Sequence, residues 1–112
     1  MINAVEIRHY ITRSGKDAFN HWLSELADIR AQAKIAARIN RLAAGNFGDC
    51  KALGQALYEL RIDWGPGFRV YYAMIGPARV LILCGGDKRA QVSDIAKARE
   101  YLTDYKARTT KK

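Results

Sequence analysis

The chain has 112 residues, of which 49% are hydrophobic and 27% are charged, and its formal net charge is +8. This length and composition are those of one folded domain, and they exclude two domains with separate cores. Four of the 19 basic residues lie in an acid-free C-terminal segment: Lys106, Arg108, Lys111 and Lys112. The other 15 stand against 11 acidic residues, so the body of the domain carries a net charge of +4. A basic body favours polyanions or an acidic protein partner, with a merely solvated surface as the alternative.

The cysteines and the N-terminal residues indicate the cellular compartment in which we expect the protein. Cys50 and Cys84 are too few for a disulfide framework, and Cys84 lies in the most apolar run of the chain. The first residues have no signal-peptide pattern, and no apolar stretch approaches the length of a membrane span. We therefore expect a cytoplasmic protein with reduced thiols.

The N-terminal half predicts one strand and a helical hairpin. Residues 2–12 are rich in β-branched side chains, which is typical of a strand. A helix is expected from Ala18, with Ser14 as its N-cap, because the next apolar residues follow helical spacing: Phe19, Trp22, Leu23 and Leu26. A second helix should begin after a capping Asp28 and run to about Ala44. Gly45 then ends that helix and opens a loop that extends to about Leu53.

The C-terminal half predicts a three-stranded antiparallel meander and a last helix. Residues 57–63 and 68–75 alternate between apolar and polar, and a turn with Pro66 at i+1 and Gly67 at i+2 separates them. Residues 80–84 form a short apolar run, which suits a strand buried on both faces. A helix over residues 90–105 follows. The order β-α-α-β-β-β-α defines an α+β fold, with one domain over residues 1–107 and a basic disordered tail over residues 108–112.

Four charged residues of the meander are the first candidate site. Strand alternation places Glu59, Arg61 and Arg69 on one face of neighbouring strands, and Lys88 at the rim where the chain leaves the sheet. Two guanidiniums, an amine and a carboxylate on a rigid sheet suit the handling of a phosphodiester. A cross-strand ion pair on a solvated face is the alternative.

A second basic feature lies on the second predicted helix. Its basic residues recur at i, i+4, i+8 and i+11, so they form one stripe: Arg30, Lys34, Arg38 and Arg41. Such a stripe suits contact with a phosphate backbone, and a solvated helix face is again the alternative.

Motifs for metal, nucleotide or nucleophilic chemistry are missing from the sequence. His9 and His21 are far apart, and neither has ligand spacing to a cysteine or a carboxylate. No serine or cysteine forms a nucleophile motif with a histidine. We therefore expect no metal and no cofactor.

Three segments together resemble the RelE/ParE toxin superfamily, and more closely its HigB-like "addiction module killer protein" branch: Gly45–Asp49, Glu59–Tyr71 and Leu83–Lys88. The resemblance covers nearly the whole chain, from the Trp22 helix to the Asp94 helix. It implies a helical hairpin on an antiparallel sheet and the toxin of a type II toxin–antitoxin pair. Many such toxins cleave mRNA in the ribosomal A site without a metal, using the 2′-OH of the substrate as nucleophile. It also implies a cognate antitoxin, which we expect to be a helix-turn-helix protein.

The resemblance also implies roles for the candidate residues. Arg69 would stabilise the phosphate, Arg61 would be the basic residue of the preceding strand, and Lys88 would neutralise or protonate the leaving 5′-oxygen. Glu59 is our candidate for the base, and Arg89 joins the helix stripe as an RNA-binding residue.

The chain also departs from the family pattern. Related toxins often carry a lysine where Glu59 stands, and a tyrosine near the start of the last helix, where this chain has Asp94. Two alternatives therefore remain, which are a ParE-like gyrase inhibitor without nuclease chemistry and a non-catalytic basic module bound to an antitoxin.

Overall fold

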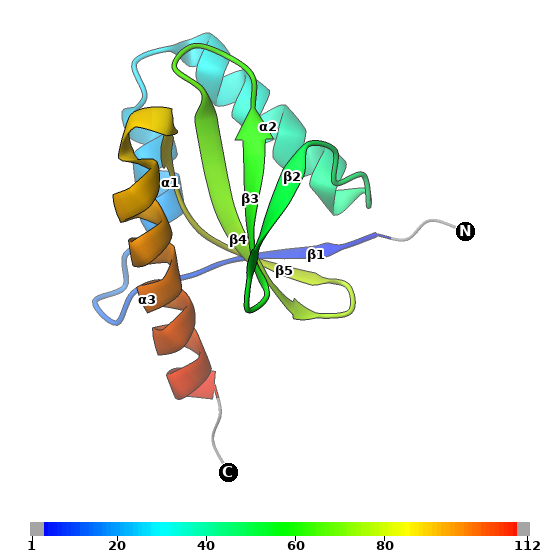
Figure 1. Cartoon of the computed structure of the whole chain (residues 1–112), viewed down its shortest axis with the longest axis vertical. Helices are drawn as coiled ribbons and strands as arrows, with labels where there is room; N and C mark the ends of the chain where they lie inside the picture. Colours follow the sequence, from blue (N-terminus) through cyan, green and yellow to red (C-terminus); the bar gives the residue numbers. More distant parts are fainter. Residues whose placement is uncertain (1–3, 110–112) are drawn as a thin grey trace.

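A five-stranded mixed sheet runs through the middle of the domain (Figure 1). The computed structural model describes residues 4–109. The sheet has the order β1-β5-β4-β3-β2, and its strands are β1 (Glu6–His9), β2 (Cys50–Gly54), β3 (Leu57–Ile62), β4 (Phe68–Gly76) and β5 (Arg79–Asp87). β1 pairs with β5 in parallel, and the other neighbours are antiparallel.

Helices cover both faces of this sheet. α1 (Ala18–Glu25) and α2 (Ile29–Ala43) form the hairpin on one face, and α3 (Gln91–Thr109) follows a short 3-10 turn (Lys88–Ala90) and covers the other. The first face has a core that joins Phe19 and Ile35 of the helices to Leu60 and Val70 of the strands. The second core joins the strands to Leu102 of α3. No helix within residues 4–109 is both long enough and apolar enough to cross a bilayer.

Strand alternation explains how the two cores are divided. Leu60 and Val70 belong to the core beneath α1 and α2, whereas Leu57 and Tyr71 belong to the core beneath α3. The α+β class and the two-sided burial of β5 are confirmed. The face that carries Glu59 is not a solvated face, because α3 packs over it.

The prediction of four strands was wrong, because β2 lies in the segment that we expected to be a loop. β2 pairs with β3, with Lys51 opposite Glu59. Gln55 and Ala56, which connect the two strands, have positive φ angles of 55° and 69°. Such conformations are usually signalled by Asn-Gly or Asp-Gly. The hairpin therefore has no turn motif in its sequence.

The structure also corrects the ends of several elements. Asp17, not Ser14, caps α1, while Asp28 caps α2 as predicted. Gly67 donates its N–H to Trp64 O, so the turn begins one residue earlier than expected. α3 continues to Thr109, beyond the expected start of the disordered tail, because Arg108 donates to Ile11 O at 2.6 Å and pairs with Asp104. Residues 2–3 of the predicted first strand and residues 110–112 of the predicted tail lie outside the described residues.

Gly85 provides a test of the packing between α1 and β5. A Cβ atom at Gly85 would overlap the ring of Trp22, whereas a Cβ at Gly76 would lie no closer than 3.6 Å to the nearest side chain. Neither glycine has a positive φ. We expect Gly85→Ala to lower the free energy of unfolding in urea by about 1–3 kcal/mol through overpacking. Gly76→Ala is the matched control and should be neutral or slightly stabilising; equal effects of the two would contradict this packing.

The two cysteines should differ in reactivity. Burial raises the pKa of the Cys84 thiol to about 12, whereas Cys50 is half-buried on the edge strand β2. Because the thiolate is the nucleophile, native Cys84 should react with iodoacetamide at pH 8 at least about a hundredfold more slowly than Cys50. Peptide mapping by mass spectrometry measures both rates, and unfolding in urea should abolish the difference. Similar rates in the native protein would be inconsistent with the burial of Cys84.

Candidate functional site

The candidate site is built on a carboxylate that lies inside the domain. Glu59 of β3 has an exposed fraction of 0%. Its Oε2 accepts a hydrogen bond of 2.6 Å from Nε2 of Gln91, at the start of α3, and one of 3.3 Å from the hydroxyl of Tyr71 in β4. Its Oε1 accepts a hydrogen bond of 3.3 Å from Nε of Arg61. A buried charge is tolerated when it is paired and hydrogen-bonded, and three elements supply these partners.

Two arginines converge on this carboxylate, as strand alternation predicted. Arg61 and Arg69 are directly opposite each other in the β3–β4 ladder. Arg69 Nε lies 3.2 Å from Glu59 Oε2, close enough for an ion pair although its N–H is not aligned for a hydrogen bond. Arg69 Nη1 donates to Gly67 O at 3.0 Å, which fixes the guanidinium against the β3–β4 turn. The side chain of Arg61 is 38% exposed and that of Arg69 is 13% exposed, so both reach from the interior towards solvent.

A hollow of about 260 Å³ opens above these guanidiniums. Its lining includes Arg61, Arg69 and the exposed Lys88, together with Asp49 and Asp63. Lys88 is therefore at the rim, as predicted, and the structure brings Arg61, Arg69 and Lys88 to one opening. Glu59 lies beneath that opening, with no surface of its own.

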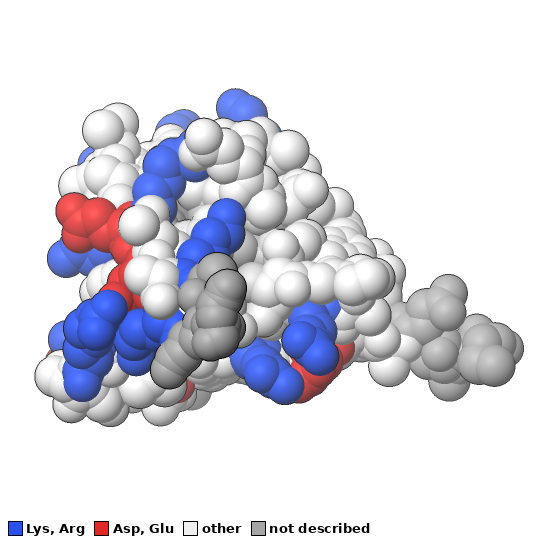
Figure 2. Space-filling view, turned by 90° about the horizontal axis from the view of Figure 1, so that it is seen from below, with Lys and Arg blue, Asp and Glu red and all other residues white. Residues whose placement is uncertain are grey.

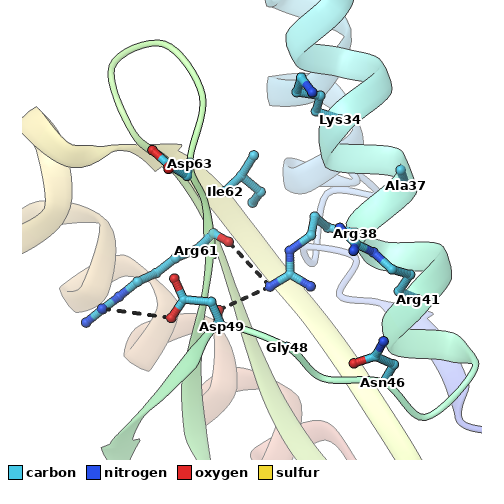
Figure 3. A pocket seen from close by; sticks show the side chains of 10 residues that line it. All are labelled: Lys34, Ala37, Arg38, Arg41, Asn46, Gly48, Asp49, Arg61, Ile62 and Asp63. Atoms are coloured by element: carbon cyan, nitrogen blue, oxygen red, sulfur yellow. Dashed lines mark hydrogen bonds and ion pairs between the residues drawn. The ribbon is translucent and has the colours of Figure 1, made fainter.

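A second hollow of about 430 Å³ adjoins the first and shares four lining residues with it: Asp49, Arg61, Ile62 and Asp63. Lys34, Arg38 and Arg41 of α2 supply its other wall (Figure 3). The exposed Lys34 also lies 4.6 Å from the ring centroid of Trp64, which is a cation–π contact. The two hollows form one groove that runs from α2 to Lys88, and we call it the basic groove.

Arg38 departs from the predicted basic stripe because it is buried, with an exposed fraction of 8%. Its guanidinium donates to three main-chain carbonyls, those of Phe47, Asp49 and Arg61, at 3.1–3.5 Å. Figure 3 shows the bonds to Asp49 and Arg61. A Cβ at Gly48 would lie 2.7 Å from Arg38 Nη1, and the positive φ of Gly48, 62°, favours glycine there. Arg38 therefore holds the α2–β2 loop against β3 and is not an exposed contact for RNA.

The sequence contained a signal for the burial of Arg38. The buried residues of α2 are Ala31, Ile35, Arg38 and Leu42, a stripe at i, i+4, i+7 and i+11. Arg38 therefore lies on the apolar face of α2 as well as in its basic stripe.

The remaining predicted RNA-binding residues lie outside the basic groove. Arg30 and Arg89 are exposed, and Arg89 pairs with Asp87 at 2.8 Å. Positive charge also gathers at the opposite end of the molecule, where the last turns of α3 and the β4–β5 turn lie (Figure 2). Acidic side chains lie among the basic ones there, and pairs such as Arg79–Glu6 and Arg108–Asp104 partly neutralise them.

Asp94, at the start of α3, is a half-buried acid near the site. Its Oδ2 is buried without a hydrogen-bond partner, and it fills the space that a side chain at Gly86 would need. Burial, with the nearby Asp87 as a further cause, raises the pKa of Asp94 above its usual range. Gly86 and Asp94 therefore fit each other, and this contact sets how closely α3 approaches β5.

Sequence analysis missed three residues of the site, which are Asp49, Tyr71 and Gln91. Alternation placed Tyr71 on the Glu59 face, but no local signal indicated that Gln91 reaches back to the sheet. Among residues 4–109, no three histidine, cysteine or acidic side chains lie close enough together to hold a metal ion.

Fold and site together define an α+β domain with a mixed five-stranded sheet and a basic groove at one end. No protein-family model matches the chain. An uncharacterized protein of Haemophilus influenzae is 52% identical to it over 81 residues, which cover 72% of this chain and 82% of that protein. The chain belongs to the same family as that protein.

Arg38 and Arg41 lie on adjacent turns of α2, so replacing each by alanine tests whether Arg38 has a structural role. Arg38→Ala removes the donor to three carbonyls, so we expect a loss of about 2 kcal/mol or more in the free energy of unfolding in urea. Arg41→Ala, on an exposed position of the same helix, should change it by less than about 0.5 kcal/mol. Equal values for the two variants would contradict a structural role for Arg38.

Proposed function

We propose that the chain is the toxin of a type II toxin–antitoxin pair, a RelE-like domain that cleaves mRNA on translating ribosomes in the cytoplasm. One observation carries the proposal, which is that Arg61 and Arg69 are held by the buried Glu59 beneath an opening with Lys88 at its rim. Preorganised guanidiniums in a partly desolvated site are suited to the charge that develops on a phosphodiester.

The proposed reaction uses the substrate as its own nucleophile. Arg61 and Arg69 bind the non-bridging oxygens of the scissile phosphate and stabilise the extra negative charge in the transition state. Lys88 is exposed at the rim and can approach the leaving 5′-oxygen. The main task of the enzyme is then to align the 2′-OH with the bond that breaks.

Burial of Glu59 changes the role that we assign to it. With no exposed surface and partners on both oxygens, its carboxylate does not meet a substrate hydroxyl in this conformation. We therefore assign Glu59 the positioning of both arginines, in place of proton transfer.

The basic groove supports binding of an RNA backbone beyond the scissile phosphate. Lys34 and Arg41 line its outer part, and both are exposed. Contacts of this kind require clustered positive charge and weaken with salt. We propose that the cognate antitoxin, a helix-turn-helix protein, covers the same groove with an acidic segment.

A ParE-like gyrase inhibitor is the second candidate. The observation that favours it is the burial of Glu59, because an internal ion-pair cluster can serve the fold alone. A non-catalytic basic module that binds an antitoxin is the third.

Induction of the wild-type chain and of Arg69→Ala in cells, followed by mapping of new mRNA 5′ ends, tests the nuclease. We expect cleavage within translated codons for the wild type and a loss of at least about a hundredfold for Arg69→Ala, because one phosphate ligand is missing. Lys97→Ala, a charge-matched change on an exposed position of α3, is the control and should cleave like the wild type.

A folded Arg69→Ala that remains equally toxic would overturn the assignment of this site. Growth arrest with intact mRNA and a DNA-damage response would favour gyrase inhibition. Normal growth with intact mRNA would favour the non-catalytic module.

A further inference from the structure

The proposed reaction requires a group that takes the proton of the 2′-OH. The acidic residues near the opening differ in whether a substrate can reach them. Glu59 is buried, and Asp94 Oδ2 is enclosed against Gly86. Asp87 accepts from both the backbone N–H and the guanidinium of Arg89, and these bonds hold its pKa below the usual range. These three carboxylates are therefore already occupied or enclosed.

Asp49 is open to the substrate side. Its side chain is 66% exposed, and it lines both hollows of the basic groove where they meet. Its Oδ1 lies 4.0 Å from Arg61 Nη1 (Figure 3). Because Arg61 Nε also lies 3.3 Å from Glu59 Oε1, one guanidinium lies between the buried Glu59 and the exposed Asp49. A carboxylate beside the phosphate ligand is in position to meet a hydroxyl of the same nucleotide.

The backbone of Asp49 is fixed although most of its side chain is exposed. Its carbonyl oxygen accepts from Arg38 Nη2 at 3.1 Å and from the N–H of Arg61 at 3.0 Å. Both donors belong to rigid elements, α2 and β3. The buried Arg38 therefore determines where the carboxylate of Asp49 is presented.

Asp63 also lines both hollows, and it is the rival for this role. Its side chain points into the β3–β4 turn, away from the guanidinium of Arg61 (Figure 3). Asp49 is thus the better placed of the two exposed carboxylates.

We propose that Asp49 is the proton acceptor of the site and that Arg38 is its positioning residue. This inference rests on the proposed function. The Asp49 carboxylate takes the proton of the 2′-OH as the 2′-oxygen bonds to phosphorus. The bond from phosphorus to the 5′-oxygen breaks, and the Lys88 ammonium gives a proton to that oxygen. The products are a 2′,3′-cyclic phosphate and a 5′-hydroxyl, so no water, metal or oxidant is consumed.

The test uses purified full-length protein, ribosomes and an mRNA in the A site, with the cleavage position first mapped for the wild type. Asp49→Asn should lower the single-turnover rate about a hundredfold, and Asp49→Glu should recover part of it, because general base catalysis contributes on this scale. Glu100→Gln on the exposed side of α3 is the control. Binding is measured separately with an mRNA that carries a 2′-deoxynucleotide at the mapped position and cannot be cleaved.

The binding measurement distinguishes a loss of catalysis from a loss of folding. Asp49→Asn should bind the deoxy mRNA as tightly as the wild type or more tightly, because a negative charge is removed beside the phosphate. A loss of rate in Asp49→Asn that is matched by weaker binding would overturn the role of Asp49, and so would an unchanged rate in this variant. A larger loss of rate in Asp63→Asn than in Asp49→Asn would also overturn it. If the wild type itself cleaves nothing, the proposed function fails and this inference fails with it.

Discussion

The carboxylate of Glu59 is the charged group on which the arrangement of the site depends. A carboxylate with no exposure is very costly unless its oxygens are paired and hydrogen-bonded, and here β3, β4 and α3 each supply a partner. This requirement fixes how α3 lies over the sheet and which way Arg61 and Arg69 turn. Such a buried cluster adds little net stability compared with apolar packing, but it specifies one geometry.

The same constraint gives the two arginines unequal environments. Arg69 is mostly buried and also fixed to the β3–β4 turn through Gly67, while Arg61 is more exposed and extends towards Asp49. A ligand phosphate would therefore meet one rigid guanidinium and one that can adjust. Because Glu59 neutralises part of their charge from below, the positive charge left at the opening depends on Lys88 and on the α2 residues of the basic groove.

Arg38 performs a comparable task on the other side of the sheet. It occupies the inward-facing stripe of α2 and donates to three main-chain carbonyls, those of Phe47 and Asp49 in the α2–β2 loop and that of Arg61 in β3. Gly48 leaves room for it. The groove is thus shaped by two buried charged residues, Glu59 and Arg38, and its exposed basic residues can vary without loss of that shape.

The sequence by itself determined the features that depend on local periodicity: the helical hairpin, the alternating strands, and the placement of Glu59, Arg61 and Arg69 on one face. It also contained the buried stripe that includes Arg38. Only the tertiary structure decided that β2 pairs as a fifth strand, that α3 covers Glu59 through Gln91, and that Asp49 meets Arg61. The pairing of strands, the packing of a helix over a sheet and the burial of a side chain all depend on residues far apart in the chain. No local sequence pattern therefore predicts which distant group will pair with a buried charge.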